Sequence, residues 1–171
     1  KSRYAICILH KDRSNFVGML KRVIVKAGFA PKRVRCDGAA EYLSQDVFDF
    51  FEQMNIQPEY SNPEEQFGNG ASEKFVDTVG KGMRALLLQS HLPPEMWGLA
   101  LHYVTDVYNH LPHEALEGKI PYAVHHGTTP DVSWFRPWGC AAVVFRGRDI
   151  VEHHKLAPRG EMGVFVGLGH S

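Results

Sequence analysis

Apolar residues in the first 60 positions alternate between short runs and helical spacing. An apolar run at 4–9 predicts a buried strand, and the spacing from 16 to 28 predicts a helix. A second strand is predicted at 34–36, a helix over 44–54 and a third strand at 56–60. Because strands alternate with helices, the pattern favours an α/β fold with parallel strand pairing.

Polar residues before these two helices predict how they begin. Asp12 or Ser14 is expected to cap the first helix, and Gly28 is expected to end it. Ser44 is expected to cap the second helix. The second helix carries an apolar set at Val47, Phe48, Phe51 and Met54.

A long helix is predicted from about residue 72 to residue 90, after a polar loop at 61–70. Gly80 and Gly82 each cost about 1 kcal/mol relative to alanine inside a helix. They either permit the close approach of another backbone or are tolerated weaknesses. The expected apolar face holds Val76, Val79, Met83 and Leu87, and a neighbouring stripe holds Glu73, Asp77, Gly80 and Arg84, with Lys81 beside it.

The remainder of the chain predicts one more helix, a connector and two strands. Proline at 93–94 stops the long helix and starts the next, since proline is accepted at the first helical position. Little periodicity follows at 111–129, and apolar runs at 138–145 and 163–167 predict strands. The expected buried face of the helix holds Trp97, Ala100, Leu101, Val104 and Tyr108, and the three tryptophans are expected in the core. The expected domains are an α/β core at 1–115, a connector at 116–132 and a small β module at 133–171.

Composition adds limits rather than a function. The apolar fraction of 44% and the charged fraction of 22% are typical of a soluble globular protein. A formal net charge of zero means that any nucleic-acid binding must come from local charge. No apolar run approaches 18 residues, so no membrane span is expected, and three widely spaced cysteines favour a reduced intracellular protein. The ends at Lys1 and Ser171 are interpreted as cuts through a longer polypeptide.

Two acidic residues are the candidate chemical site. Asp37 follows the strand at 34–36, Glu73 opens the long helix, and 35 residues separate them. Carboxylates at a strand end and a helix start can meet and share a hard divalent cation. Taken singly, Asp37 also suits a turn and Glu73 a carboxylate stabilised by the helix dipole.

Six motifs in order resemble a known family. Arg35-Cys36-Asp37-Gly38-Ala39-Ala40-Glu41-Tyr42 is similar to R-S-D-N-G-G-E-Y, and Gly68-Asn69-Gly70-Ala71-Ser72-Glu73-Lys74 is similar to Q-N-G-V-A-E-R. Further matches are Leu92-Pro93 with Trp97, Asn109-His110-Leu111-Pro112 with Ile120-Pro121-Tyr122, Trp138-Gly139-Cys140 and Lys155-Leu156-Ala157-Pro158-Arg159-Gly160. Together they resemble the integrase region of copia-type LTR retrotransposon polyproteins.

The resemblance implies an RNase H-like core lacking its first strands, followed by an SH3-like β module. Such enzymes join element DNA ends to target DNA by phosphoryl transfer, with three carboxylates around two Mg²⁺ or Mn²⁺ ions. By resemblance, Asp37 and Glu73 are catalytic metal ligands. DNA and further copies of the chain are the implied partners, and the nucleus and a cytoplasmic particle are the implied locations. The residues expected to contact DNA are Asn69, Lys74, Lys81 and Arg84.

Departures from the family leave three interpretations open. The first catalytic Asp is expected upstream of Tyr4, and Asp12 lies too far, roughly 10 Å, to replace it. Asp77 places a negative charge one turn from Glu73 on the expected DNA face. The chain is therefore a fragment of a strand-transfer enzyme, a catalytically dead remnant that binds nucleic acid, or a domesticated protein-interaction core with helix 94–109 as a dimer surface. Without its partner strand, the strand at 4–9 is expected to move beside the strand at 34–36, unless the fragment is unstable alone.

Overall fold

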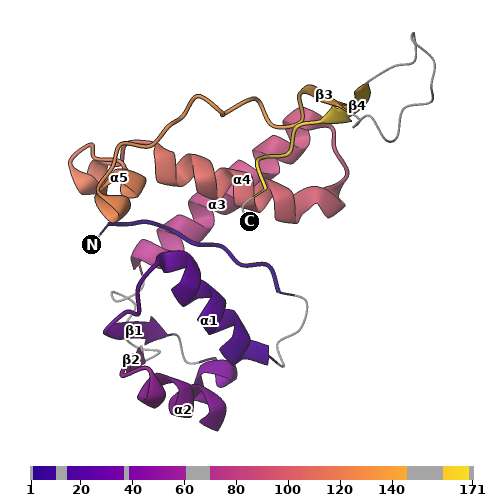
Figure 1. Ribbon diagram of the computed structural model, residues 1–171. Helices are drawn as coiled ribbons and strands as arrows, with labels where there is room; N and C mark the ends of the chain where they lie inside the picture. The colour runs from indigo at the N-terminus through magenta and orange to yellow at the C-terminus, as the bar shows by residue number, and fades with distance from the viewer. Residues whose placement is uncertain (1, 11–14, 37–38, 61–69, 146–159, 170–171) are drawn as a thin grey trace. The chain divides into compact units, whose positions relative to one another are not determined.

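The computed structural model describes residues 2–10, 15–36, 39–60, 70–145 and 160–169 (Figure 1). The chain forms two compact units, and each is described by itself. One unit comprises Ile6–Thr78, and the other comprises Lys1–Ala5 with Val79–Ser171.

The unit Ile6–Thr78 holds a small parallel sheet with two helices. Strands β1 and β2 pair in parallel, from Arg33 opposite Gln57 to Cys36 opposite Tyr60. This pairing confirms the α/β pattern predicted for these segments. The elements are α1 (Phe16–Ala27), β1 (Arg33–Cys36), the 3-10 helix η2 (Ala40–Leu43), α2 (Gln45–Gln53), β2 (Gln57–Tyr60) and the first turns of α3 (Gly70–Ser90).

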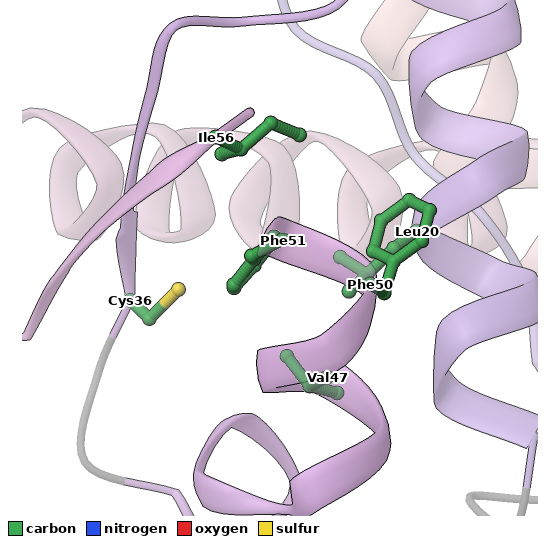
Figure 2. Close-up of a cluster of buried hydrophobic side chains, with 6 residues drawn as sticks. All are labelled: Leu20, Cys36, Val47, Phe50, Phe51 and Ile56. Atoms are coloured by element: carbon green, nitrogen blue, oxygen red, sulfur yellow. The ribbon is translucent and has the colours of Figure 1, made fainter. Parts of the chain in front are cut away.

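The core of this unit forms where α1, α2 and the sheet meet (Figure 2). Phe50 and Phe51 are 4% and 2% exposed, whereas Phe48 and Met54 of the same apolar set are 39% and 37% exposed. Phe48 lies about 100° around the helix from Val47, and Met54 lies beyond the last turn. Each fully buried Phe or Leu contributes about 2–3 kcal/mol. The buried cluster is Leu20, Cys36, Val47, Phe50, Phe51 and Ile56.

The caps of α1 and α2 differ from expectation. Asn15, rather than Asp12 or Ser14, caps α1, and its Oδ1 accepts a hydrogen bond from the Gly18 N–H at 2.9 Å. The residue immediately before the helix reaches the free N–H groups of the first turn, and Asn serves there as well as Ser. Ser44 does occupy the N-cap position of α2, but its hydroxyl donates to the Glu41 carbonyl at 3.1 Å.

The predicted strand at 4–9 is absent. Residues 4–9 pair with no strand in the described parts of the chain, and β1 pairs only with β2 there. The expected move of 4–9 beside β1 is therefore also wrong. Instead, the Asn109 side chain accepts a hydrogen bond from the Ala5 N–H at 2.9 Å and donates one to the Ala5 carbonyl at 2.8 Å. An amide side chain thus takes the place that a neighbouring strand would occupy.

The second unit is built on the antiparallel hairpin β3–β4 and two long helices. The hairpin register runs from Ala141 opposite Val164 to Phe145 opposite Gly160. Ala100, Tyr103 and Trp138 are the buried centre of the unit. Its elements are the rest of α3, η4 (Pro94–Met96), α4 (Trp97–His110), η5 (Glu114–Leu116), α5 (Pro121–His126), β3 (Ala141–Phe145) and β4 (Gly160–Val164).

The buried face of α4 is rotated from the predicted one, whereas α3 packs Met83 and Leu87 of its predicted face against the core. Val79 is 2% exposed as expected, but Val76 is 68% exposed. On α4 the buried apolar residues are Ala100 and Tyr103, whereas Trp97 is 49% exposed. Trp97 is the first residue of α4 and lies about 60° around the helix from Ala100, at the edge of the buried face.

Helix α5 lies inside the segment predicted to be a connector with little periodicity. Pro121 occupies its first turn, and Gly127 ends it with φ 74°. These are ordinary start and stop signals, but six residues are too few to show a periodicity. One hairpin is what the described residues show of the expected SH3-like module, so that module and the domain boundaries remain predictions. None of the helices in the described part of the chain combines the length and apolar character needed to cross a bilayer.

Candidate catalytic and DNA-binding site

Glu73 lies in the first turn of α3, with its side chain exposed. The free N–H groups of a helix N-terminus carry partial positive charge and stabilise a carboxylate there. The position therefore presents an acidic group to solvent at the start of a 21-residue helix. This is the environment in which a carboxylate remains available for a cation.

Asp37 and Asn69 lie outside the described residues, so the Asp37–Glu73 pair remains a prediction. The strand that leads to Asp37 is described up to Cys36, which is 2% exposed and lies opposite Tyr60. Burial of Cys36 fixes the end of β1 in the core. Asp37 follows Cys36 directly in the sequence.

The 3-10 helix η2 is held by contacts of Tyr42 with two other segments. The Tyr60 hydroxyl donates to the Tyr42 carbonyl at 3.2 Å, and the Tyr42 ring meets the Phe16 ring edge-on at 4.7 Å between centroids. Burial raises the pKa of Tyr60, and the nearby Cys36 adds to this rise. The hydroxyl therefore stays protonated and keeps donating across the neutral pH range. Sequence reasoning missed this contact because Tyr42 and Tyr60 are distant in the chain and share no periodicity.

The candidate DNA-binding residues in the described part of the chain all lie on α3. Lys74, Lys81 and Arg84 are exposed. At about 100° per residue, Arg84 lies about 20° around the helix from Glu73, and Asp77 about 40°. The stripe therefore mixes acidic and basic groups, as predicted from the spacing. The Thr78 hydroxyl donates to the Lys74 carbonyl at 2.7 Å within the same helix.

The described residues do not by themselves make a metal centre. Carboxylate oxygens suit Mg²⁺ or Mn²⁺ chemically. However, no three His, Cys, Asp or Glu side chains within the described ranges are grouped so that they can hold an ion. Glu73 is the one predicted ligand that the structure describes, and a two-metal site needs more carboxylates than this. No disulfide joins Cys7, Cys36 or Cys140, all of which lie in the described part of the chain.

Comparison with known proteins identifies relatives of one kind. The chain is 26% identical over 138 residues to the retrovirus-related Pol polyprotein from transposon TNT 1-94 of Nicotiana tabacum, a match that covers 81% of this chain and 10% of that polyprotein. It is 28% identical over 131 residues to the transposon Ty1-LR3 Gag-Pol polyprotein of Saccharomyces cerevisiae, covering 76% and 7%. The chain is a relative of retrotransposon Pol polyproteins. This confirms the copia-type resemblance, and the chain spans about a tenth of the length of the relatives it matches.

A further relative is the Pol polyprotein from transposon RE1 of Arabidopsis thaliana, 26% identical over 131 residues, covering 77% of this chain and 9% of that one. No protein-family model matches this chain.

Solved structures give the fold. The HTLV-2 integrase catalytic core in complex with magnesium aligns with a TM-score of 0.54 at 18% identity, covering 67% of this chain and 70% of that chain. A simian T-cell lymphotropic virus intasome in complex with a PP2A regulatory subunit aligns with a TM-score of 0.58 at 18% identity, covering 91% and 54%. The BIV integrase catalytic core aligns with a TM-score of 0.57 at 12% identity, covering 74% and 80%. This chain therefore has the RNase H-like fold of integrase catalytic cores, as predicted.

Proposed function

We propose that this chain is part of an integrase that joins element DNA ends to target DNA by metal-dependent phosphoryl transfer. The observation that carries the proposal is the exposed Glu73 carboxylate in the first turn of α3, in a chain with an integrase-core fold. Asp37, directly after β1, is the second proposed carboxylate. The relatives support a function related to integration.

Each proposed site residue has one role. Asp37 and Glu73 are the proposed catalytic carboxylates. They would hold Mg²⁺ or Mn²⁺, and the positive charge of the ion would stabilise the attacking and leaving oxygens. Lys74, Lys81 and Arg84, together with Asn69, would contact DNA phosphates. The proposed partners are the two DNA substrates and further copies of the chain. The proposed locations are the nucleus and a cytoplasmic particle.

A second candidate function is nucleic-acid binding without catalysis. The observation that favours it is the exposed Asp77, one helical turn from Glu73. A second negative charge on this stripe weakens phosphate contact and crowds a cation site. In this case the basic residues of α3 would still bind DNA, but Glu73 would be dispensable.

DNA binding tests the proposed surface on α3. We expect fluorescence anisotropy with a labelled duplex to give an affinity that falls as salt rises, since phosphate contacts release counterions. Replacing both Lys81 and Arg84 with Gln removes two such contacts and should reduce the slope of log K against log salt by about 2. Lys119→Gln, at an exposed position off α3, is the matched control. An unchanged slope in the double variant would remove α3 from the DNA interface.

A further inference from the structure

A cluster of aromatic and imidazole rings gathers around Tyr4, and we call it the Tyr4 cluster. The Tyr4 ring stacks on the His125 ring at 4.3 Å between centroids and 7° between planes. It also meets His126 edge-on at 5.2 Å. Tyr122 lies 4.3 Å from His126 and 4.9 Å from His110. The cluster therefore joins the N-terminal segment to the end of α4 and to α5, all within one unit.

The residue after Tyr4 is fixed by a separate contact. Ala5 forms its two backbone hydrogen bonds with Asn109, which is 3% exposed. Asn109 and His110 are the last two residues of α4, so the same helix end holds Tyr4 and Ala5. Because residues 4–9 have no strand partner in the described parts of the chain, these contacts replace sheet pairing at this point.

Three histidines in the cluster make it sensitive to protonation. The rings of His125 and His126 lie 4.6 Å apart, and His110 contacts Tyr122, which in turn contacts His126. Two imidazolium charges at this separation repel each other. Stacking of a protonated His125 on Tyr4 is attractive but opposes this repulsion only in part.

The surroundings of His126 and of Tyr4 favour the neutral form of each side chain. Although His126 has an exposed side, burial against the cluster lowers its pKa, and His125 and His110 lower it further. Burial raises the pKa of Tyr4, with smaller contributions from Asp106 and Tyr122. The His110 Nδ1 atom lies 2.7 Å from the Asp106 carbonyl. Tyr4 therefore stays a neutral phenol, and the carboxylate of Asp106 is the charge on α4 that faces it.

We propose that the Tyr4 cluster is a pH-sensitive clasp: with neutral imidazoles it holds Tyr4 and Ala5 on α4 and α5, and protonation at His126 releases them. In the unfolded chain His126 takes up a proton near its ordinary pKa, whereas in the fold it does so only at lower pH. The stabilisation is therefore present above the ordinary pKa and is lost as pH falls through the lower, folded value. The released residues are Tyr4 and Ala5, which lie in no strand in the described chain.

Amide hydrogen exchange at Ala5 measures this release directly, because the Ala5 N–H donates to Asn109. After correction for the intrinsic exchange rate, we expect protection at Ala5 to fall several-fold between about pH 7.5 and about pH 5.5, a range that spans the ordinary histidine pKa. In the His126→Gln variant protection at Ala5 should change little with pH. His91→Asn removes an exposed histidine at a position with φ 54°, which Asn tolerates, and should keep the wild-type pH dependence.

An NMR titration of the His126 ring in the wild-type chain keeps the test independent of how any variant folds. A titration midpoint below the ordinary histidine value is expected. A midpoint at or above that value overturns the proposal. Protection at Ala5 that does not change with pH, or that falls equally in His126→Gln, also overturns it.

Discussion

At the scale of single residues, two glycines in the middle of α3 differ in what surrounds them. A Cβ atom built on Gly82 lies 2.8 Å from Val104 Cγ1, whereas one built on Gly80 meets only Arg84 Nη1 at 3.8 Å. The sequence left open whether these glycines permit a close approach or are tolerated. At Gly82 the structure shows a close approach, and the approaching group is a side chain of α4 rather than a backbone. Such a contact depends on the relative rotation of two helices, which spacing within one helix does not determine.

Alanine at the two positions should therefore have opposite effects on stability. Gly80→Ala should raise the free energy of unfolding by up to about 1 kcal/mol, since alanine favours the helix. Gly82→Ala gains the same propensity but forces the stiff Val104 side chain to move, at a cost of about 1–3 kcal/mol. Urea unfolding followed by circular dichroism measures both. Equal stabilisation by both substitutions would contradict the close packing of α3 on α4.

At the scale of elements, strong local sequence signals predicted the positions of helices and strands well and the burial of their side chains less well. The helices at 16–27, 45–53 and 70–90 and both strands of the parallel pair were predicted from apolar spacing and their end signals. The strand at 4–9 was wrong because its apolar run suits any buried extended segment, and sheet pairing depends on a partner elsewhere. Helix α5 was missed because its Pro and Gly signals enclose only six residues. Trp97 is exposed because it lies at the edge of the face that Ala100 and Tyr103 bury.

The entry to the β3–β4 hairpin depends on a close contact with the end of α3. Gly139 has φ 81°, and a Cβ there would lie 2.4 Å from Ser90 Cβ. Gly118 has φ 80° with nothing within 4 Å of its Cβ position. Both alanine variants carry a left-handed strain of about 1–2 kcal/mol, but Gly139→Ala adds a steric conflict. Thermal melts should place Gly139→Ala below Gly118→Ala, and equal melting temperatures would contradict the contact.

At the scale of the whole molecule, the order of the six sequence motifs predicted the fold. The comparisons confirm a relative of retrotransposon Pol polyproteins with an integrase-core fold. The structure describes only part of the candidate site that the sequence predicts. Glu73 is where the helical spacing placed it, exposed at the start of α3, while Asp37 and Asn69 lie outside the described residues. Distances between carboxylates depend on how strand ends and helix starts meet, which the linear spacing of 35 residues does not determine.

The central claim is that Glu73 serves an integrase reaction, and strand transfer tests it most directly. The assay follows joining of an element-end oligonucleotide to target DNA with Mn²⁺, using the full-length protein that contains this chain. Glu73→Gln keeps the size of the side chain but removes its charge, and Glu95→Gln, at an exposed position in η4, is the matched control. We expect Glu73→Gln to lower product formation by about 10²-fold or more and Glu95→Gln to leave it unchanged. Equal product from wild type and Glu73→Gln, or no product from wild type, would contradict the claim.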